Sequence, residues 1–321
     1  MEWEKKLGLS DEPFNPNSLI VKSIQRYEYI PIDFIKCKVV NFPKEVLLNN
    51  PILDFISFIN TETGEIKTKK IAKYKNFKIV INDSGYMEFS GSIHMYFNEG
   101  KHNYNDFTYE RYKDALKRIY EDLGLCPSNL WILNLEYGVN IKPPIKTKII
   151  LDHCFIHKRL PISRVINNNE GQYIQAEHKG NYILKIYDKA KQYQRHNNEH
   201  IFLKEILRIE VKQIRWGKYR DLGIFTIEDF NNYDKTIFIN DLINKWNDVV
   251  LYDSERSKLN YNDKYLSINY WISLLDRNSK TYYKHVRKLK KENKDFGKDI
   301  QFQISETIKS YIENMNQILI D

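Results

Sequence analysis

The sequence predicts an α+β fold: a mainly antiparallel central sheet with helices packed on one side, followed by an all-helical C-terminal domain. Three observations support this fold class. Several segments before residue 222 alternate apolar and polar residues, as half-buried strands do. The segment 107–125 has apolar residues at helical spacing, and the patterns after about residue 222 are helical.

Residues 1–32 are predicted to form an irregular extension, because prolines interrupt them. The first strand is expected at 33–40. Further strands are expected at 53–60 and 77–83, with a turn between them at "TETGEIK", and 85–98 is expected as a strand pair or one long bent strand.

A helix is expected at 107–125, where Gly124 is a suitable C-cap. The next strand, 130–141, stops before Pro143 and Pro144, and strands at 182–189 and 205–214 follow with a short charged helix between them. Helices are then expected at 239–252, 266–277, 281–293 and 303–319. The predicted domains are therefore an extension at 1–32, a mixed domain at 33–222 and a helical domain at 223–321.

Composition narrows the functional class. The 321-residue chain has a net charge of +8, which suits a polyanionic partner. Its three cysteines form no CxxC pair, which argues against a zinc knuckle and a disulfide scaffold and fits a reducing cytoplasm. Neither an apolar signal core nor a run of about 20 apolar residues is present, so we expect a cytoplasmic protein without a membrane span.

Alternation places polar residues of four predicted strands on one sheet face. They are Lys185, Tyr187 and Lys189; Arg208, Glu210 and Lys212; Asn134, Glu136 and Asn140; and Glu88, Ser90, Ser92 and His94. A solvated face of an antiparallel sheet gives the same alternation without any function, and this alternative stays open.

These residue types also suit chemistry on a phosphodiester. A phenol titrates near pH 10, so it is a weak nucleophile unless cations such as Lys185 and Lys189 favour its phenolate. Glu136 and Glu210 are hard oxygen ligands of the kind that Mg²⁺ or Mn²⁺ prefers, and such an ion polarises phosphate. The combination predicts a tyrosine that attacks DNA and forms a covalent phosphotyrosine.

Four segments, in order, resemble a known family: "GSIHMYFNEGKHNYNDF" (91–107), "LNLEYGVNI" (133–141), "LKIYDKAKQY" (184–193) and "LRIEVKQ" (207–213). They resemble the rolling-circle replication initiators of phages and plasmids, in particular proteins related to filamentous-phage gene II protein and, more loosely, the staphylococcal-plasmid Rep initiators. The resemblance covers about residues 33–215. It implies a metal-dependent, site-specific nickase that forms a 5′-phosphotyrosine and later rejoins the strand.

Carried over by position, the resemblance implies Tyr187 as the nucleophile, with Tyr193 as the alternative. Lys185 and Lys189 would assist it. The residues implied as ligands of Mg²⁺ or Mn²⁺ are Glu136, Glu210 and His102, and those implied as DNA contacts are Asn103 and Arg208. The implied partners are origin DNA, single-stranded or hairpin at the nick, and a host helicase.

One departure concerns the metal ligands. The His-apolar-His triplet of many nicking initiators is absent from this sequence, so the metal ligands here are implied rather than recognised. The nearest pair is His153 and His157, whose i, i+4 spacing would place them on one face of a helix; a solvated pair is the simpler interpretation.

The C-terminal domain carries a basic segment. Between 280 and 294, the residues predicted to contact DNA are Lys284, Arg287, Lys288, Lys290 and Lys291. Two helices joined by a short turn suit a helix-turn-helix, and a surface helix that contacts only phosphates is the simpler alternative.

The functional alternatives are a transposase or conjugative relaxase of the same chemistry and a non-catalytic origin- or operator-binding protein. An RNA-binding sheet is less favoured, because no RNP-type aromatic pattern is present.

Overall fold

The computed structural model describes residues 32–59, 62, 64, 66–105, 107–167, 171–196, 205–255 and 263–313. The predicted extension at 1–32 therefore lies almost entirely outside the described residues. The chain divides into two compact units. Unit 1 comprises Met1–Asn103, Phe107–Glu136 and Gln213–Lys235; unit 2 comprises Tyr104–Asp106, Tyr137–Lys212 and Thr236–Asp321. The units interleave along the chain, and the division at residue 222 stays a prediction.

In unit 1 the strands are bonded in the order β2-β3-β4-β5-β1-β6. Their bounds are β1 Ile32–Val39, β2 Ile56–Ile59, β3 Ile66–Tyr74, β4 Phe77–Asn82, β5 Met87–Ser92 and β6 Leu130–Ile141, and β6 continues into unit 2. The neighbours from β2 to β1 pair antiparallel, which confirms the predicted type of sheet. β3 was not predicted, because four lysines in "IKTKKIAKY" hide its alternation.

The prediction of strand throughout 85–98 was wrong. The strand ends at Ser92, whose Oγ accepts a hydrogen bond from the Met95 amide at 3.0 Å and caps helix α2 (Ile93–Phe97). A capping serine inside an alternating run was the local signal for this change.

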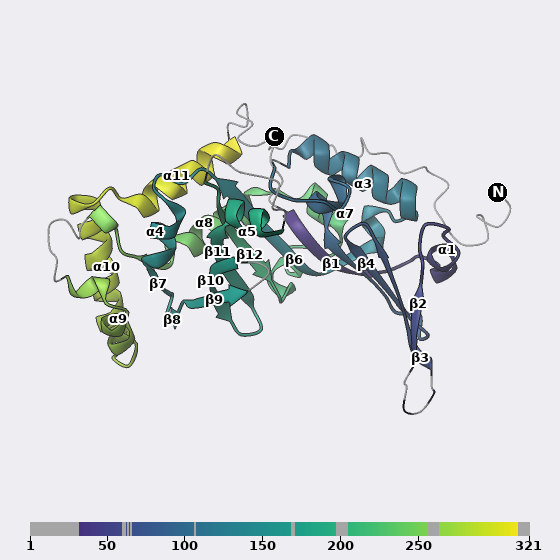
Figure 1. Ribbon diagram of the computed structural model, residues 1–321, viewed down its shortest axis with the longest axis horizontal. Coiled ribbons are helices and arrows are strands. Elements are labelled where there is room, and N and C mark those ends of the chain that lie inside the picture. The colour runs from purple at the N-terminus through teal and green to yellow at the C-terminus, as the bar shows by residue number, and fades with distance from the viewer. Residues whose placement is uncertain are drawn as a thin grey trace. The chain divides into compact units, whose positions relative to one another are not determined.

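Helix α3 (Tyr109–Leu123) confirms the helix predicted at 107–125. Thr108 caps its start, and Gly124 ends it with a left-handed φ of 73°, a conformation that glycine adopts without strain. The helix lies alongside the unit 1 strands (Figure 1), and the hydroxyls of Tyr74 and Tyr96 donate to Asp122 near its end. The shorter helices of unit 1 are α1 (Lys44–Leu48), the 3₁₀ helix η3 (Pro127–Asn129), α6 (Gly217–Arg220) and α7 (Ile227–Asn232).

In unit 2 the order is β6-β12-β11-β10-β9. The bounds are β9 Ser163–Asn167, β10 Gly171–His178, β11 Tyr182–Asp188 and β12 Leu207–Gln213, and α4 (Thr147–Asp152) and α5 (Lys189–His196) belong to the same unit. β11 and β12 confirm predicted strands, whereas β9 and β10 were not predicted. A second sheet has the order β13-β7-β8, with β7 Cys154–His157, β8 Leu160–Pro161 and β13 Val249–Leu251.

The helical end of the chain is confirmed. It contains α8 (Thr236–Asn247), the 3₁₀ helix η5 (Lys264–Leu266), α9 (Ile268–Leu275), α10 (Ser279–Phe296) and α11 (Ile300–Glu313). The helix predicted at 239–252 ends earlier, because Val249–Leu251 form β13 instead. Within the described ranges, no helix is both long and apolar enough to cross a membrane.

The suggestion that His153 and His157 share a helix face was wrong. α4 ends at Asp152, and His157 is the last residue of strand β7. His157 is fully buried, and its Nδ1 lies 2.7 Å from His178 Nε2. The two histidines of "HCFIH" therefore do not form an i, i+4 helical pair.

Candidate functional site

The "YDK" segment lies where β11 ends, in unit 2. The Tyr187 hydroxyl donates to Glu210 Oε2 on β12 at 3.0 Å. The two strands stay paired to this end, since the Lys189 amide donates to the Ile206 carbonyl at 2.9 Å. Tyr187 is 7% exposed and Glu210 4% exposed. The predicted shared face of these two strands is therefore present, and it is largely buried.

Two cations neutralise the Glu210 carboxylate. Arg208 Nε donates to Oε2 at 2.6 Å, and Lys185 Nζ donates to Oε1 at 3.1 Å. Burial alone would raise the pKa of Glu210, but the charges of Arg208 and Lys185 and the Arg208 hydrogen bond outweigh it and hold the pKa at about 2. The carboxylate therefore stays ionised at neutral pH.

Strand β6, which neighbours β12, contributes two further residues to this cluster. Asn140 Oδ1 accepts from Arg208 Nη1 at 3.0 Å, so the guanidinium is bound at both ends. A Cβ at Gly138 would lie 2.6 Å from the Glu210 Cβ and 2.6 Å from the Ile209 carbonyl. The glycine of "LEYGVN" is thus needed for close approach of the strands beside Glu210.

The helix that follows holds the other predicted residues. Asp188 begins α5 by accepting from the Lys191 amide at 3.0 Å. Lys189 is 5% exposed, and its Nζ lies 5.9 Å from the centre of the Tyr187 ring. Tyr193 is half-buried, and its ring centre lies 4.4 Å from that of Tyr104. Tyr193 is therefore more accessible than Tyr187.

Sequence reasoning missed Tyr173. In the β10–β11 ladder it lies directly opposite Tyr187, so the two side chains share a sheet face. Tyr173 is half-buried rather than buried. Alternation in "GQYIQAEH", followed by a turn at Gly180, was the available signal for this strand.

Three of the predicted residues, His102, Asn103 and Glu136, belong to unit 1. Asn103 Nδ2 donates to both oxygens of Asp33, at 3.2 and 2.9 Å, and Ser92 Oγ donates to Asp33 as well. Asp33 is 7% exposed and was not predicted, although an acidic residue at the start of a strand was visible in "IDFIKCKV". Glu136 is buried, and His102 Nδ1 lies 3.3 Å from Asn98 Nδ2.

The residues around Glu210 do not fit the Mg²⁺ or Mn²⁺ that the family resemblance implies. Both carboxylate oxygens already bind a cationic side chain, and a divalent ion at the same oxygens would be repelled by Arg208 and Lys185. In the part of the chain that the structure describes, no three histidine, cysteine, aspartate or glutamate side chains are grouped to hold a metal.

The basic residues of α10 divide into two sets. Lys284, Arg287, Lys288 and Lys291 are exposed. Lys290 is half-buried, its Nζ donates to the Asn247 carbonyl at 2.5 Å, and burial lowers its pKa. α9 and α10 are joined by a short turn, in which Asn278 caps α10 by accepting from the Thr281 amide at 2.9 Å.

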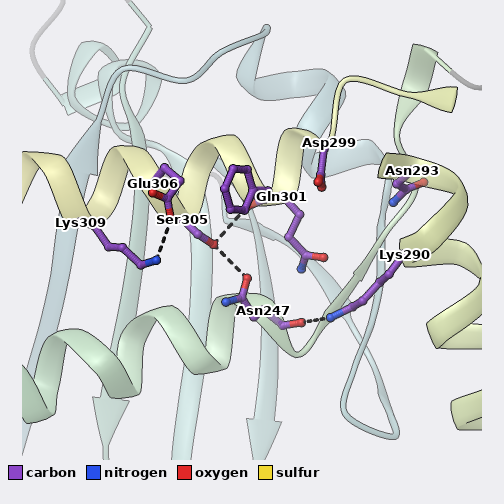
Figure 2. Close-up of a pocket in the computed structure, with 9 residues that line it drawn as sticks. Asn247, Lys290, Asn293, Asp299, Gln301, Ser305, Glu306 and Lys309 are labelled. Atoms are coloured by element: carbon purple, nitrogen blue, oxygen red, sulfur yellow. Dashed lines mark hydrogen bonds and ion pairs between the residues drawn. The ribbon is translucent and has the colours of Figure 1, made fainter. Parts of the chain in front are cut away.

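Lys290 lies at a pocket of about 340 Å³ beside α11 (Figure 2). Several polar groups around it are already bonded. Ser305 Oγ donates to Asn247 Oδ1 at 2.9 Å, which ties α11 to α8, and within α11 Lys309 pairs with Glu306 at 2.6 Å. The pocket therefore belongs to the packing of the helical end.

No known family model matches this chain, and no curated protein matches it. A solved structure titled as that of a rolling circle replication initiator protein from Geobacillus stearothermophilus is similar, with a TM-score of 0.40 and 13% identity. The match covers 76% of this chain and 94% of that one. Similarity at this low level shows neither the family nor the function of this chain.

Proposed function

We propose that this protein initiates rolling-circle DNA replication by nicking one strand with a tyrosine and later rejoining it. The observation that supports the proposal best is the contact between Tyr187 and Glu210, set among Lys185, Lys189 and Arg208. A phenol can attack a phosphodiester when cations and a carboxylate lie beside it, and this cluster contains all of these groups. The family resemblance of residues 33–215 is the second support.

The reaction would proceed without a change in oxidation state. The tyrosine oxygen forms a bond to phosphorus, and the bond from phosphorus to the 3′ oxygen of the preceding nucleotide breaks. The phenol's proton passes through solvent to that 3′ oxygen, which leaves as a hydroxyl. The 5′ phosphate stays on the tyrosine, and attack by a 3′ hydroxyl reverses the step and rejoins the strand.

The residues around the tyrosine have separate roles in this proposal. Lys185 and Lys189 stabilise the charge that develops on the phosphate and on the phenolate. Glu210 accepts the phenol hydrogen bond and fixes the orientation of the ring. Arg208 holds Glu210 in place through its two hydrogen bonds. No step is assigned to a metal ion, because the residues around Glu210 do not fit one.

Origin DNA is the proposed substrate, and α10 the proposed contact to its backbone. Four of the five predicted cations on this helix are exposed. Contacts to phosphate place the protein on DNA but carry no sequence information, so selection of an origin has to come from base contacts elsewhere.

A random-sequence pool of single-stranded DNA, labelled at the 3′ end, tests the proposal. With Mg²⁺ and Mn²⁺ both supplied, the wild-type chain should retain label through denaturing electrophoresis, and Tyr187→Phe should retain none while still binding the pool. Tyr233→Phe, a change outside the cluster, is the matched control. If neither the wild-type chain nor Tyr233→Phe retained label, nicking would be contradicted.

A non-catalytic DNA-binding protein is the second candidate. It is favoured by the burial of Tyr187 and Glu210, which leaves little of either side chain in contact with solvent. This candidate predicts binding of the pool without retained label, so the same experiment separates the two.

A further inference from the structure

The outer face of the unit 1 sheet carries a row of cations. Lys73 on β3 lies directly opposite Lys78 on β4. Lys78 lies opposite Ser90 on β5, and Ser90 lies opposite Lys36 on β1. Directly opposite residues point to the same face, so three lysines and one serine form a line across four strands. Two further lysines, Lys38 and Lys69, extend this face by the same alternation.

The helices of unit 1 cover the other face. Phe77 and Phe89 alternate with the lysine positions, and their ring centres lie 4.1 Å apart in the core. Tyr96 of α2 packs on Phe77 with ring centres 5.0 Å apart, and Asp122 of α3 accepts from Tyr74. The lysine face is consequently on the side away from α2 and α3.

The lysines on this face are accessible, and one carboxylate balances them. Lys38, Lys69, Lys73 and Lys78 are exposed, and the Lys36 side chain is 43% exposed. Among the residues that the structure describes, Glu88 is the carboxylate that pairs with this set, through Lys36 at 3.0 Å. Five cations facing a single carboxylate leave a strongly positive surface.

Ordinary roles of surface lysine do not explain this arrangement. Lysine protects edge strands from aggregation, but β4, β5 and β1 are interior strands of the sheet order. Like charges directly opposite each other, as Lys73 and Lys78 are, destabilise a sheet. Folding alone would therefore favour another residue at one of these two positions.

We infer that this face binds the backbone of single-stranded DNA. The row spans three inter-strand spacings of about 4.8 Å, or about 14 Å, which is long enough to meet several consecutive phosphates. Tyr86 lies on the same face, half-buried, with Lys38 Nζ 5.9 Å from its ring centre. Proteins that bind single strands combine cations with such rings, on which unpaired bases stack. Bases inside a duplex are not available for that contact.

The inference uses the proposed function only for the identity of the partner, and it does not depend on the tyrosine chemistry. It also assigns residues that lie outside the basic helix α10. A nicking protein has to hold one DNA strand after that strand separates from its complement. The positive charge of this face suits it to bind that strand.

The test compares the full chain with Lys73→Gln/Lys78→Gln, without added metal, so that no cleavage contributes. The probe is a fluorescent oligothymidine of about 20 nucleotides, longer than the roughly 4–16 nucleotides that a single-strand-binding fold covers. The matched control is Lys113→Gln/Lys117→Gln on α3, which removes the same charge from the opposite side of unit 1.

The lysine-face variant should bind about 20-fold more weakly at 0.1 M salt, and its salt slope should shrink by about 1.4, because two phosphate contacts are lost. Its unfolding midpoint should not fall, since the like-charge pair is removed. Affinity equal to that of the control, or a larger loss on duplex than on single-stranded DNA, would overturn the inference. If the wild-type chain formed no covalent adduct with DNA, the nicking proposal would be contradicted, but the inference about the lysine face would not.

Discussion

Tyr187 and Glu210 are 23 residues apart in the sequence and are joined by a 3.0 Å hydrogen bond between neighbouring strands of unit 2. The same carboxylate is bound by Arg208 and Lys185, so its two oxygens accept from three side chains. The phenol is thus oriented by a group that is itself fixed by opposite charges.

Removing the Glu210 charge should destabilise the protein strongly. Glu210→Gln leaves Arg208 buried without its counter-charge, and such a change costs about 3–5 kcal/mol of unfolding free energy. The measurement is denaturant unfolding at pH 7. A loss below about 1 kcal/mol would mean that solvent, not Glu210, satisfies the guanidinium.

The same pair predicts a pH dependence. The pKa of Glu210 is about 2 in the folded chain, below the ordinary value of 4.5, so its contribution is complete above about pH 4.5 and is lost as pH falls toward 2. The shift corresponds to about 3 kcal/mol. The difference in unfolding free energy between wild type and Glu210→Gln should therefore shrink over this range. A constant difference from pH 5 to pH 2.5 would contradict the ion pair.

Gly138 should tolerate no side chain. In Gly138→Ala the new Cβ would lie 2.6 Å from both the Glu210 Cβ and the Ile209 carbonyl, which costs about 1–3 kcal/mol through overpacking. Gly217→Ala is the control, because nothing lies within 4 Å of a Cβ at that position. Thermal unfolding of both variants checks the prediction, and equal midpoints would refute the close approach of β6 and β12.

His157 should make the protein less stable in mild acid. Burial, followed by His178 and Lys158, lowers its pKa to about 3, whereas the unfolded chain takes up the proton near pH 6.5. Stability is therefore lost as pH falls from about 6.5 toward 3. In His157→Leu this loss should be smaller, although the variant forfeits the bond to His178 at neutral pH. Parallel pH profiles of the two proteins would show that another group titrates.

The two sets of cations on α10 should respond differently to substitution. Lys284→Ala and Arg287→Ala should each weaken binding to duplex DNA and reduce the salt slope by about 1, with little change in stability. Lys290→Ala should leave binding unchanged and lower stability by about 1 kcal/mol, since it removes a bond to the Asn247 carbonyl. A loss of binding in Lys290→Ala equal to that in Arg287→Ala would contradict this division.

The fold class followed from patterns that are local in sequence. α3 has helical spacing and a glycine C-cap, and β11 and β12 alternate, so each was predictable. β3 was missed because lysines occupy apolar positions of the usual strand pattern, whereas β10 was missed although its sequence alternates. β13 was missed because a three-residue strand has too few residues to show a period.

The site was predictable only in part. Alternation identified the face that holds Tyr187, Arg208 and Glu210, but their contacts depend on strand register, which the sequence does not specify. That dependence explains why Glu210 was predicted as a metal ligand, whereas its oxygens bind Arg208 and Lys185. The positions of Asp33 and Tyr173 depend on partners that are distant in sequence, Asn103 and Tyr187 respectively.

Peptide mapping of the covalent DNA–protein adduct identifies the nucleophilic tyrosine directly. The account predicts a phosphate-linked nucleotide on a tyrosine of the segment from Tyr187 to Tyr193, with Tyr187 first, and its loss in the corresponding phenylalanine variant. An adduct on Tyr173 would move the nucleophile to the neighbouring strand on the same sheet face. No adduct at all, or one on a tyrosine other than Tyr187, Tyr193 and Tyr173, would contradict the proposed nicking site.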